Sequence, residues 1–344
     1  MSERDSLCRE ISCSGKIAET GGLHMKKIGI LTSGGDAPGM NAVIRTVVRA
    51  GIAYGMDVMG IQQGYRGLID DDMKFMDATD VEDIMQRGGT ILRTARCEEF
   101  LTEEGRETAL KNLRLHGIDS LIVCGGDGSF KGAQLLNGLG MNVMCIPCTI
   151  DNDMGYTDYT IGFDTAVGTV IDAVSKIQDT AGSHGRTTIV EVMGRNCGDI
   201  ALYAGIAAGV ECIMIPEVAQ EPYDVCRRIV EARDKGKNHS IIIRAEGAAV
   251  STDDIADVIY RETGFEVRKV ILSYVQRGGT PSASDRLRAC MMGHEAVRLI
   301  NEQSDSRAVG IHDDHIINVE IKEAVETSTV CNLELVELAE FLSR

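Results

Sequence analysis

The sequence contains no tryptophan, and Phe and Tyr together make up only 4% of it. So few aromatic side chains argue against the stacking platforms on which proteins bind single-stranded nucleic acid. No stretch approaches the roughly 18 consecutive apolar residues that a membrane-spanning helix requires. Residues 1–24 are polar and lack the apolar core of a signal peptide, so we expect a disordered extension before Met25.

Positive charge is also scarce, because 35 Lys and Arg residues stand against 52 Asp and Glu residues, for a formal net charge of −17. An acidic surface repels nucleic acid and anionic membranes, and we expect neither as a partner. The same field repels phosphorylated substrates. Any phosphate site must therefore be a local cluster of Arg, Lys and backbone N–H groups.

The 11 cysteines are an odd number and lie in apolar runs such as 121–124. This pattern is typical of reduced, buried thiols and predicts a cytoplasmic protein. Cys145 and Cys148 form one C-x-x-C pair, but no second pair stands at metal-binding spacing. We therefore predict neither a redox nor a zinc site there.

Short apolar runs alternate along the chain with helical patterns. Strands are expected at 27–31, 119–124, 142–146, 187–192, 211–215, 240–244 and 267–275. One helix is expected after Gly39, and a second follows the turn at 125–129 and ends at about 138. Further helices are expected over 161–177, 198–209, 223–235 and 252–263. Such alternation predicts an α/β fold with parallel sheets covered on both faces. Because the chain exceeds one sheet, we expect two Rossmann-like, three-layer lobes with mainly parallel sheets and a cleft between them.

Two glycine-rich turns, 33–41 and 125–129, each join an expected strand to an expected helix. Glycine lets the backbone approach a phosphate, and the following helix N-terminus offers free N–H groups. Asp127 stands between glycines, where it could approach Mg²⁺. The alternative is that both are ordinary turns. No G-x-x-x-x-G-K-[ST] or G-x-G-x-x-G motif occurs, which argues against P-loop enzymes and standard dinucleotide dehydrogenases.

A third turn, Thr149-Ile150-Asp151-Asn152-Asp153, follows an expected strand. One of its carboxylates could act as a general base, a role that contributes about 10²–10⁴-fold to a rate. The alternative is an Asx-rich turn that caps the next helix. Five arginines lie in or beside strand ends or glycine turns, and together they favour a phosphate site: Arg96, Arg186, Arg195, Arg268 and Arg277.

From Met25 to the C-terminus the sequence resembles the bacterial ATP-dependent 6-phosphofructokinases. The segments that carry the resemblance are LTSGGDAPGMN, GGT with TAR, IVCGGDGS, TIDND, DYTIGFDTA, VEVMGR, AEG and VQRGG. It implies that ATP phosphorylates fructose 6-phosphate in glycolysis, with Mg²⁺ as cofactor. It also implies an ATP-binding lobe at 25–162, to which 276–326 return, and a substrate lobe at 163–275, on which 327–344 pack.

The resemblance also implies roles for individual residues. The general base would be Asp151, with Thr149, Asp153 and Arg195 as further catalytic residues. ATP would be bound by Gly35, Arg96, Cys97, Gly126, Asp127, Gly128 and Ser129, with Asp127 also at the metal. The sugar phosphate would be bound by Thr149, Ile150, Asp151, Arg186, Met193, Gly194, Arg195, Glu246, Arg268, Tyr274 and Arg277. Arg186 and Arg268 would serve a neighbouring subunit, which implies a homotetramer.

Some positions depart from the family pattern. Cys97 stands where Phe is common beside the nucleotide, and Tyr274 replaces a common His near the 6-phosphate. Pyrophosphate-using relatives tend to have Lys at the position of Cys148 and Asp at that of Gly128, so this chain favours ATP. Two alternatives stay open: a pyrophosphate-dependent phosphofructokinase, and a non-catalytic regulatory paralogue that binds sugar phosphate or nucleotide.

The family's effector site, which takes ADP or phosphoenolpyruvate, is matched only in part. The matching residues are Arg45, Arg49, Glu211, Lys235 and Lys237. Asp72 and Gln178 stand where arginines are usual, and Asp72 places a negative charge where a phosphate would bind. We therefore expect weakened or altered allosteric control.

Overall fold

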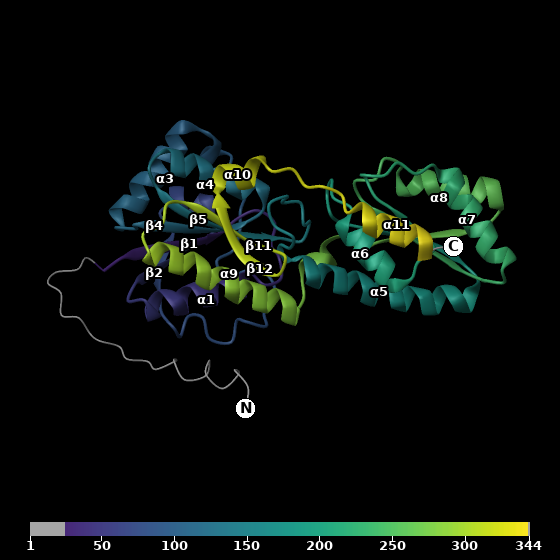
Figure 1. Ribbon diagram of the computed structural model, residues 1–344, viewed down its shortest axis with the longest axis horizontal. Coiled ribbons are helices and arrows are strands. Elements are labelled where there is room, and N and C mark those ends of the chain that lie inside the picture. The colour runs from purple at the N-terminus through teal and green to yellow at the C-terminus, as the bar shows by residue number, and fades with distance from the viewer. Residues whose placement is uncertain (1–24, 343–344) are drawn as a thin grey trace, which may run out of the picture.

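The computed structural model describes residues 25–342, and the expected extension at 1–24 lies outside them. The chain forms two sheets with helices packed around each (Figure 1). The larger sheet has the order β12-β11-β5-β4-β1-β2-β3, with β6 pairing β5. Its strands are β1 Lys27–Thr32, β2 Asp57–Ile61, β3 Met73–Met76, β4 Ser120–Gly125, β5 Asn142–Thr149, β6 Ile161–Gly162, β11 Arg307–His312 and β12 His315–Glu320.

The central strands of this sheet are parallel, and only the β2–β3 and β11–β12 pairs are antiparallel. All residues of β4 are buried, as expected for a parallel strand covered on both faces. The smaller sheet has the order β10-β7-β9-β8, and every pairing in it is parallel. Its strands are β7 Thr187–Val192, β8 Cys212–Met214, β9 Ser240–Ala245 and β10 Val267–Ile271. The two-lobed α/β fold is thus confirmed.

Helices connect the strands and cover the sheets (Figure 1). Around the larger sheet lie α1 Met40–Ala53, α2 Tyr65–Ile69, η2 Glu99–Leu101, α3 Glu103–Leu115, α4 Asp127–Gly138, α9 Ala283–Asn301 and α10 Ile321–Glu326. Around the smaller sheet lie α5 Phe163–His184, α6 Asp199–Ala208, α7 Pro222–Asp234, α8 Thr252–Thr263 and α11 Leu333–Leu342, while η3 Ser273–Arg277 leads back from it. Among residues 25–342, no helix is long and apolar enough to cross a membrane.

The chain passes from one sheet to the other through α5, and a buried carboxylate holds the start of this helix. Asp285, on α9, is completely buried. Its carboxylate accepts hydrogen bonds from the backbone N–H groups of Gly162 (3.0 Å) and Thr165 (2.9 Å). The first turn of α5 is thereby tied to a helix of the larger lobe.

The expected strand at 267–275 is wrong beyond Ile271, because Ser273–Arg277 forms a 3₁₀ helix. The apolar run continues through Tyr274 and Val275, but these side chains are 77% and 60% exposed rather than buried in a sheet. The expected helix at 161–177 begins two residues later, since Ile161 and Gly162 form β6.

Candidate active site

Three polar turns meet at one edge of the larger sheet, since they follow the neighbouring parallel strands β1, β4 and β5. A Cβ built on Gly125 would lie 2.6 Å from the carbonyl oxygen of Ser33. One built on Gly126 would lie 3.3 Å from Cβ of Thr149. The two glycine turns and the Thr149–Asp153 turn are therefore in contact, as their positions after strands predict.

The turn from Thr149 to Asp153 is held by the side chain of Asn152. This residue adopts a positive φ of 53°. Its Oδ1 accepts a hydrogen bond from the N–H of Thr160 at 3.0 Å, and its Nδ2 donates to Oδ2 of Asp199 at 2.8 Å. Asp199 begins α6 beside the smaller sheet, so this bond links the turn to the other lobe.

Asp151 is the most deeply buried carboxylate of this turn, with only 3% of its side chain exposed. Its Oδ2 lies 3.2 Å from Nε of Arg195, whereas its Oδ1 is buried and accepts no hydrogen bond from any described residue. Burial, together with the neighbouring charge of Asp153, raises the pKa of Asp151 to about 6, even though Arg195 and Arg277 act to lower it. Such a carboxyl is ionised at neutral pH but close to its titration range.

Asp127 lies in the middle of the second glycine turn and begins α4, and its Oδ2 pairs with Nζ of Lys131 at 2.7 Å. Its charge contributes to the raised pKa of Asp153, for which burial is the main cause, so the two carboxylates face one site. No group of three potential metal ligands occurs within residues 25–342. A pair of carboxylates nevertheless fits Mg²⁺, which usually binds one or two carboxylates together with substrate phosphates.

The smaller sheet supplies the facing side of the site through the turn after β7. Gly194 and Arg195 have positive φ angles of 135° and 52°. The N–H of Met193 donates to Oε1 of Gln276 at 3.2 Å, and the N–H of Arg195 donates to Oε1 of Glu246 at 2.9 Å. Arg195 then reaches Asp151, so the two lobes meet through this ion pair.

The other residues that were predicted to bind ATP lie in or beside the two glycine turns. Thr94 donates to the carbonyl oxygen of Gly34 at 2.6 Å, which places the segment leading to Arg96 and Cys97 beside the first turn. Arg96 is exposed and Cys97 is half-buried. A Cβ built on Gly128 would meet no atom within 4 Å, whereas Ser129 is buried and its carbonyl oxygen accepts from the Tyr65 hydroxyl at 2.5 Å.

Three predicted sugar-phosphate residues do not face Asp151 with their side chains. Ile150 is 1% exposed and belongs to the core, so only its backbone could touch a substrate. Arg186 precedes β7 and Arg268 is the second residue of β10, so both lie at the end of the smaller sheet away from Arg195. Arg268 pairs with Glu266 at 3.5 Å at the surface.

The predicted effector residues divide between two hollows. Glu211, Lys235 and Lys237 line one of about 200 Å³, where Lys237 pairs with Glu211. Arg45 and Arg49 line another of about 280 Å³. Of the two departures, Asp72 is exposed, and Gln178 donates to the carbonyl oxygen of Ala208 at 3.0 Å.

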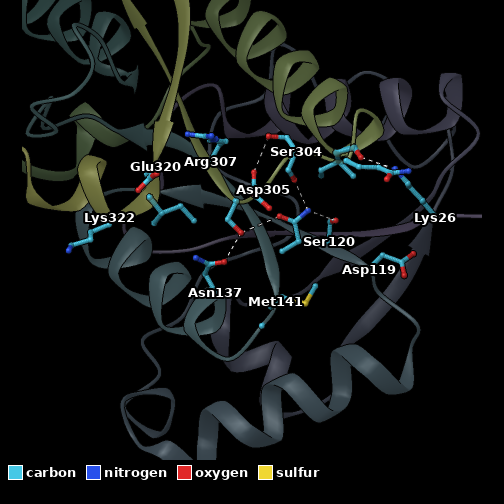
Figure 2. Close-up of a pocket in the computed structure, with 16 residues that line it drawn as sticks. Lys26, Asp119, Ser120, Asn137, Met141, Ser304, Asp305, Arg307, Glu320 and Lys322 are labelled. Carbon is cyan, nitrogen blue, oxygen red and sulfur yellow. Dashed lines mark hydrogen bonds between the residues drawn. The ribbon is translucent and has the colours of Figure 1, made fainter.

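A hollow of about 610 Å³ lies at the opposite edge of the larger sheet, where β4, β5 and β11 begin (Figure 2). It contains none of the predicted site residues. Its polar side chains bond to one another, as in the contacts of Ser306 with Asn137 at 2.7 Å and of Asn142 with Ser120 at 3.1 Å. This hollow is separate from the chemistry described above.

Sequence reasoning missed two residues whose side chains contact the turns of the site, Asp199 and Gln276. Asp199 follows Cys197 and Gly198 soon after a strand, and this third glycine–aspartate turn could have been noticed. Gln276 is completely buried, although it comes just after the segment 267–275 that was expected to form a strand.

Comparison with known proteins agrees with this geometry. The family model described as phosphofructokinase matches residues 27–300. The ATP-dependent 6-phosphofructokinases of Alkaliphilus metalliredigens and Clostridium botulinum are each 53% identical over 93% of this chain and the whole of theirs. The phosphofructokinase structure from Saccharomyces cerevisiae is 37% identical, with a TM-score of 0.86 over 91% of this chain and 50% of that one. The chain therefore belongs to the phosphofructokinase family.

Proposed function

We propose that this protein is an ATP-dependent 6-phosphofructokinase, which transfers the γ-phosphoryl group of ATP to the 1-hydroxyl of fructose 6-phosphate. Full-length relatives with 53% identity have this activity in their names. The observation that carries the proposal is Asp151, with one oxygen paired to Arg195 and the other buried without a donor. A hydroxyl of the sugar would supply the missing hydrogen bond.

In the reaction, Asp151 accepts the proton of the sugar hydroxyl, and the hydroxyl oxygen forms a bond to the γ-phosphorus. The bond from that phosphorus to the bridging oxygen of ATP breaks, and ADP leaves with the electron pair. A pKa near 6 suits a general base that works at neutral pH. The guanidinium of Arg195 lies beside the carboxylate of Asp151, close to where the reaction takes place. It would therefore neutralise negative charge on the phosphoryl group during its transfer.

The donor side is formed by the two glycine turns. Gly35 in the first turn, and the residues from Gly126 to Ser129 at the start of α4, would bind the phosphates of ATP through backbone N–H groups. Asp127, with Asp153 nearby, would hold Mg²⁺. When bound, this ion neutralises charge on the phosphate oxygens.

Two features favour ATP over pyrophosphate as the donor. The space around Gly128 is open, so the α-phosphate of a nucleotide has room there. Cys148 is 1% exposed, and burial raises the pKa of its thiol well above the usual range, so it carries no charge. The chain thus offers no cation at the position where pyrophosphate-using relatives tend to have lysine.

The sugar phosphate would lie between Glu246, Met193 and Arg195 of the smaller lobe and Arg277, which connects the lobes. Its 6-phosphate would also be bound by Arg186 and Arg268 of a partner subunit in a homotetramer. The edge strand β10 and the following 3₁₀ helix favour this assembly, because Ile271, Tyr274 and Val275 are 60% or more exposed beside Arg268.

We also propose that ADP and phosphoenolpyruvate have weaker effects than is usual in the family. The two hollows that contain the predicted effector residues would have to meet across a subunit boundary to form one site. Asp72 adds negative charge where a phosphate would bind.

All nine described cysteines are free, which favours the reducing cytoplasm as the location of the protein.

The decisive measurement is a coupled assay of fructose 1,6-bisphosphate formation, run in parallel with ATP and with pyrophosphate. We expect turnover with ATP alone. The variant Asp151→Asn should lose about 10²–10⁴-fold in kcat while still binding fructose 6-phosphate by calorimetry. Turnover only with pyrophosphate would establish the other donor. Sugar-phosphate binding without turnover in the unmodified protein would indicate a regulatory paralogue.

A further inference from the structure

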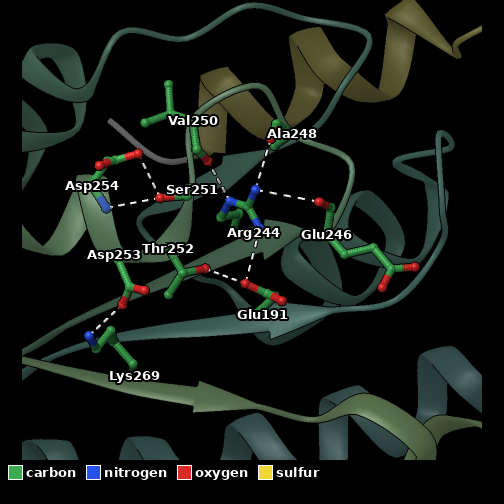
Figure 3. Close-up of polar contacts among 10 residues, drawn as sticks. All are labelled: Glu191, Arg244, Glu246, Ala248, Val250, Ser251, Thr252, Asp253, Asp254 and Lys269. Carbon is green, nitrogen blue, oxygen red and sulfur yellow. Dashed lines mark hydrogen bonds and ion pairs between the residues drawn. The ribbon is translucent and has the colours of Figure 1, made fainter.

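Arg244 is a buried cation that takes no part in the proposed chemistry. It lies on β9, is 5% exposed, and faces Glu191 across the pairing of β9 with β7 (Figure 3). Its Nη1 donates to Oε2 of Glu191 at 3.0 Å. The same carboxylate accepts a hydrogen bond from the hydroxyl of Thr252, at the start of α8. The charge of Arg244 is therefore compensated inside the smaller lobe.

The other N–H groups of this guanidinium point at the loop of residues 246–251, which joins β9 to α8 (Figure 3). Nε donates to the carbonyl oxygen of Val250 at 2.6 Å. Nη2 donates to the carbonyl oxygens of Ala248 at 2.8 Å and Glu246 at 3.4 Å. One planar side chain thus satisfies three carbonyl groups of a loop that has no regular structure.

This loop is in direct contact with the active site. The carboxylate of Glu246 accepts the N–H of Arg195 at 2.9 Å. A Cβ built on Gly247 would lie 2.0 Å from the carbonyl oxygen of Arg195, so only glycine allows this close approach. Any movement of the loop would be transmitted to Arg195, and from there to its partner Asp151.

We propose that Arg244 is a positioning residue for the sugar-phosphate site, which fixes the backbone of the loop at 246–251 and thereby the carboxylate of Glu246 and the backbone of Arg195. The proposal rests on the proposed function insofar as Glu246 and Arg195 bind the sugar phosphate. It predicts little effect on the binding of ATP, because the glycine turns that would bind ATP follow strands of the other sheet.

The competing explanation is that Arg244 only neutralises Glu191. Two variants separate the explanations. Arg244→Met removes the donors and leaves the half-buried carboxylate of Glu191 without its cation, whereas adding Glu191→Gln removes that charge as well. If Arg244 positions the loop, both variants raise the KM for fructose 6-phosphate about tenfold and change the KM for ATP less than about twofold. The thermal midpoint should recover in the double variant, whereas the KM should not.

Arg244→Lys keeps the charge but offers a single ammonium group, so we expect an intermediate KM for fructose 6-phosphate. The matched control is Arg261→Met, an exposed arginine of α8 that pairs with its neighbour Glu262 at 3.1 Å. It should leave both KM values unchanged. A double variant with a normal KM for fructose 6-phosphate would overturn the proposal.

Hydrogen–deuterium exchange gives a readout that does not depend on turnover. In the free protein, the amides of residues 246–251 should exchange faster in the double variant than in the wild type, with no change in the Arg261→Met variant. Unchanged exchange in this loop would refute the positioning role even if the enzyme were active. Absence of fructose 1,6-bisphosphate formation by the wild type would instead refute the proposed function, and the exchange result would still decide the role of Arg244.

Discussion

Arg277 lies across the backbone of Gly35, so close that a Cβ built on Gly35 would fall 1.7 Å from Nη1 of the arginine. The two residues come from segments that are far apart in the sequence, the first glycine turn and the end of η3. Gly35 was expected at the phosphates of ATP and Arg277 at the 6-phosphate of the sugar. Their contact brings the turn expected to bind ATP against a side chain expected to bind the sugar phosphate, so the two expected sites share a boundary.

Substitution of Gly35 by alanine should therefore displace Arg277. The guanidinium is the far end of a flexible side chain, so we expect the thermal midpoint to change little. The KM for fructose 6-phosphate should rise about tenfold, because a charge-assisted hydrogen bond to phosphate is lost or misdirected. Steady-state kinetics with each substrate varied would measure this. Unaltered kinetics would mean that Arg277 reaches the phosphate by another path.

The pH dependence of the reaction should report the carboxyl of Asp151. Its raised pKa, about 6, means that the base becomes protonated as the pH falls through that value. We therefore expect kcat/KM to fall about tenfold per pH unit below pH 6 and to level off above it. A profile that stays flat down to pH 4 would contradict the role of Asp151 as the base.

The cause of this shift can be tested separately, because the charge of Asp153 raises the pKa of Asp151. In the variant Asp153→Asn the acid limb of kcat/KM should move to lower pH, whatever the loss in absolute rate. The control Asp172→Asn removes an exposed carboxylate of α5 that pairs with Lys176, and it should leave the limb in place. An identical limb in both variants would rule out coupling between the two aspartates.

Gly128→Asp should selectively weaken the use of ATP. The side chain has room, and an acidic residue in the first turn of α4 favours the helix, so stability should not suffer. The added charge would face the α-phosphate, and we expect kcat/KM for ATP to fall about tenfold or more. Gly128→Asn has nearly the same size without the charge and serves as the control. Equal losses in both variants would point to steric exclusion instead.

Much of the fold could be predicted from periodicity, because strands buried on both faces are near-continuous apolar runs. The strand at Thr187–Val192 and the helix at Thr252–Thr263 have the expected bounds. Strand β12 was not among the expected strands, since it is largely half-buried or exposed and shows no long apolar run. Conversely, the apolar residues after Ile271 led us to expect a strand up to residue 275, although the strand ends at Ile271.

The glycine turns and the aspartates of the site were also predictable, because each follows a strand and the ends of parallel strands converge. The residues that hold them in place were not. Asn152 bonds to Asp199, 47 positions away, and Arg244 bonds to Glu191, 53 positions away. Such contacts depend on how the two lobes and their strands are paired, and no local pattern of residue types records that pairing.

The expected role of Arg268 across a subunit boundary can be tested with hybrid assemblies. Asp151→Asn and Arg268→Met should each be nearly inactive at low fructose 6-phosphate concentration. When the two variants are co-expressed with different tags and purified as a mixed assembly, activity should rise well above that of either alone. The reason is that, at a contact between the two kinds of subunit, one site loses both residues while the other keeps both. If Arg268 served its own subunit, every site would carry one defect and the hybrid would be no more active than its parents. The exposed position of Arg268, away from Asp151 in its own chain, favours the first outcome.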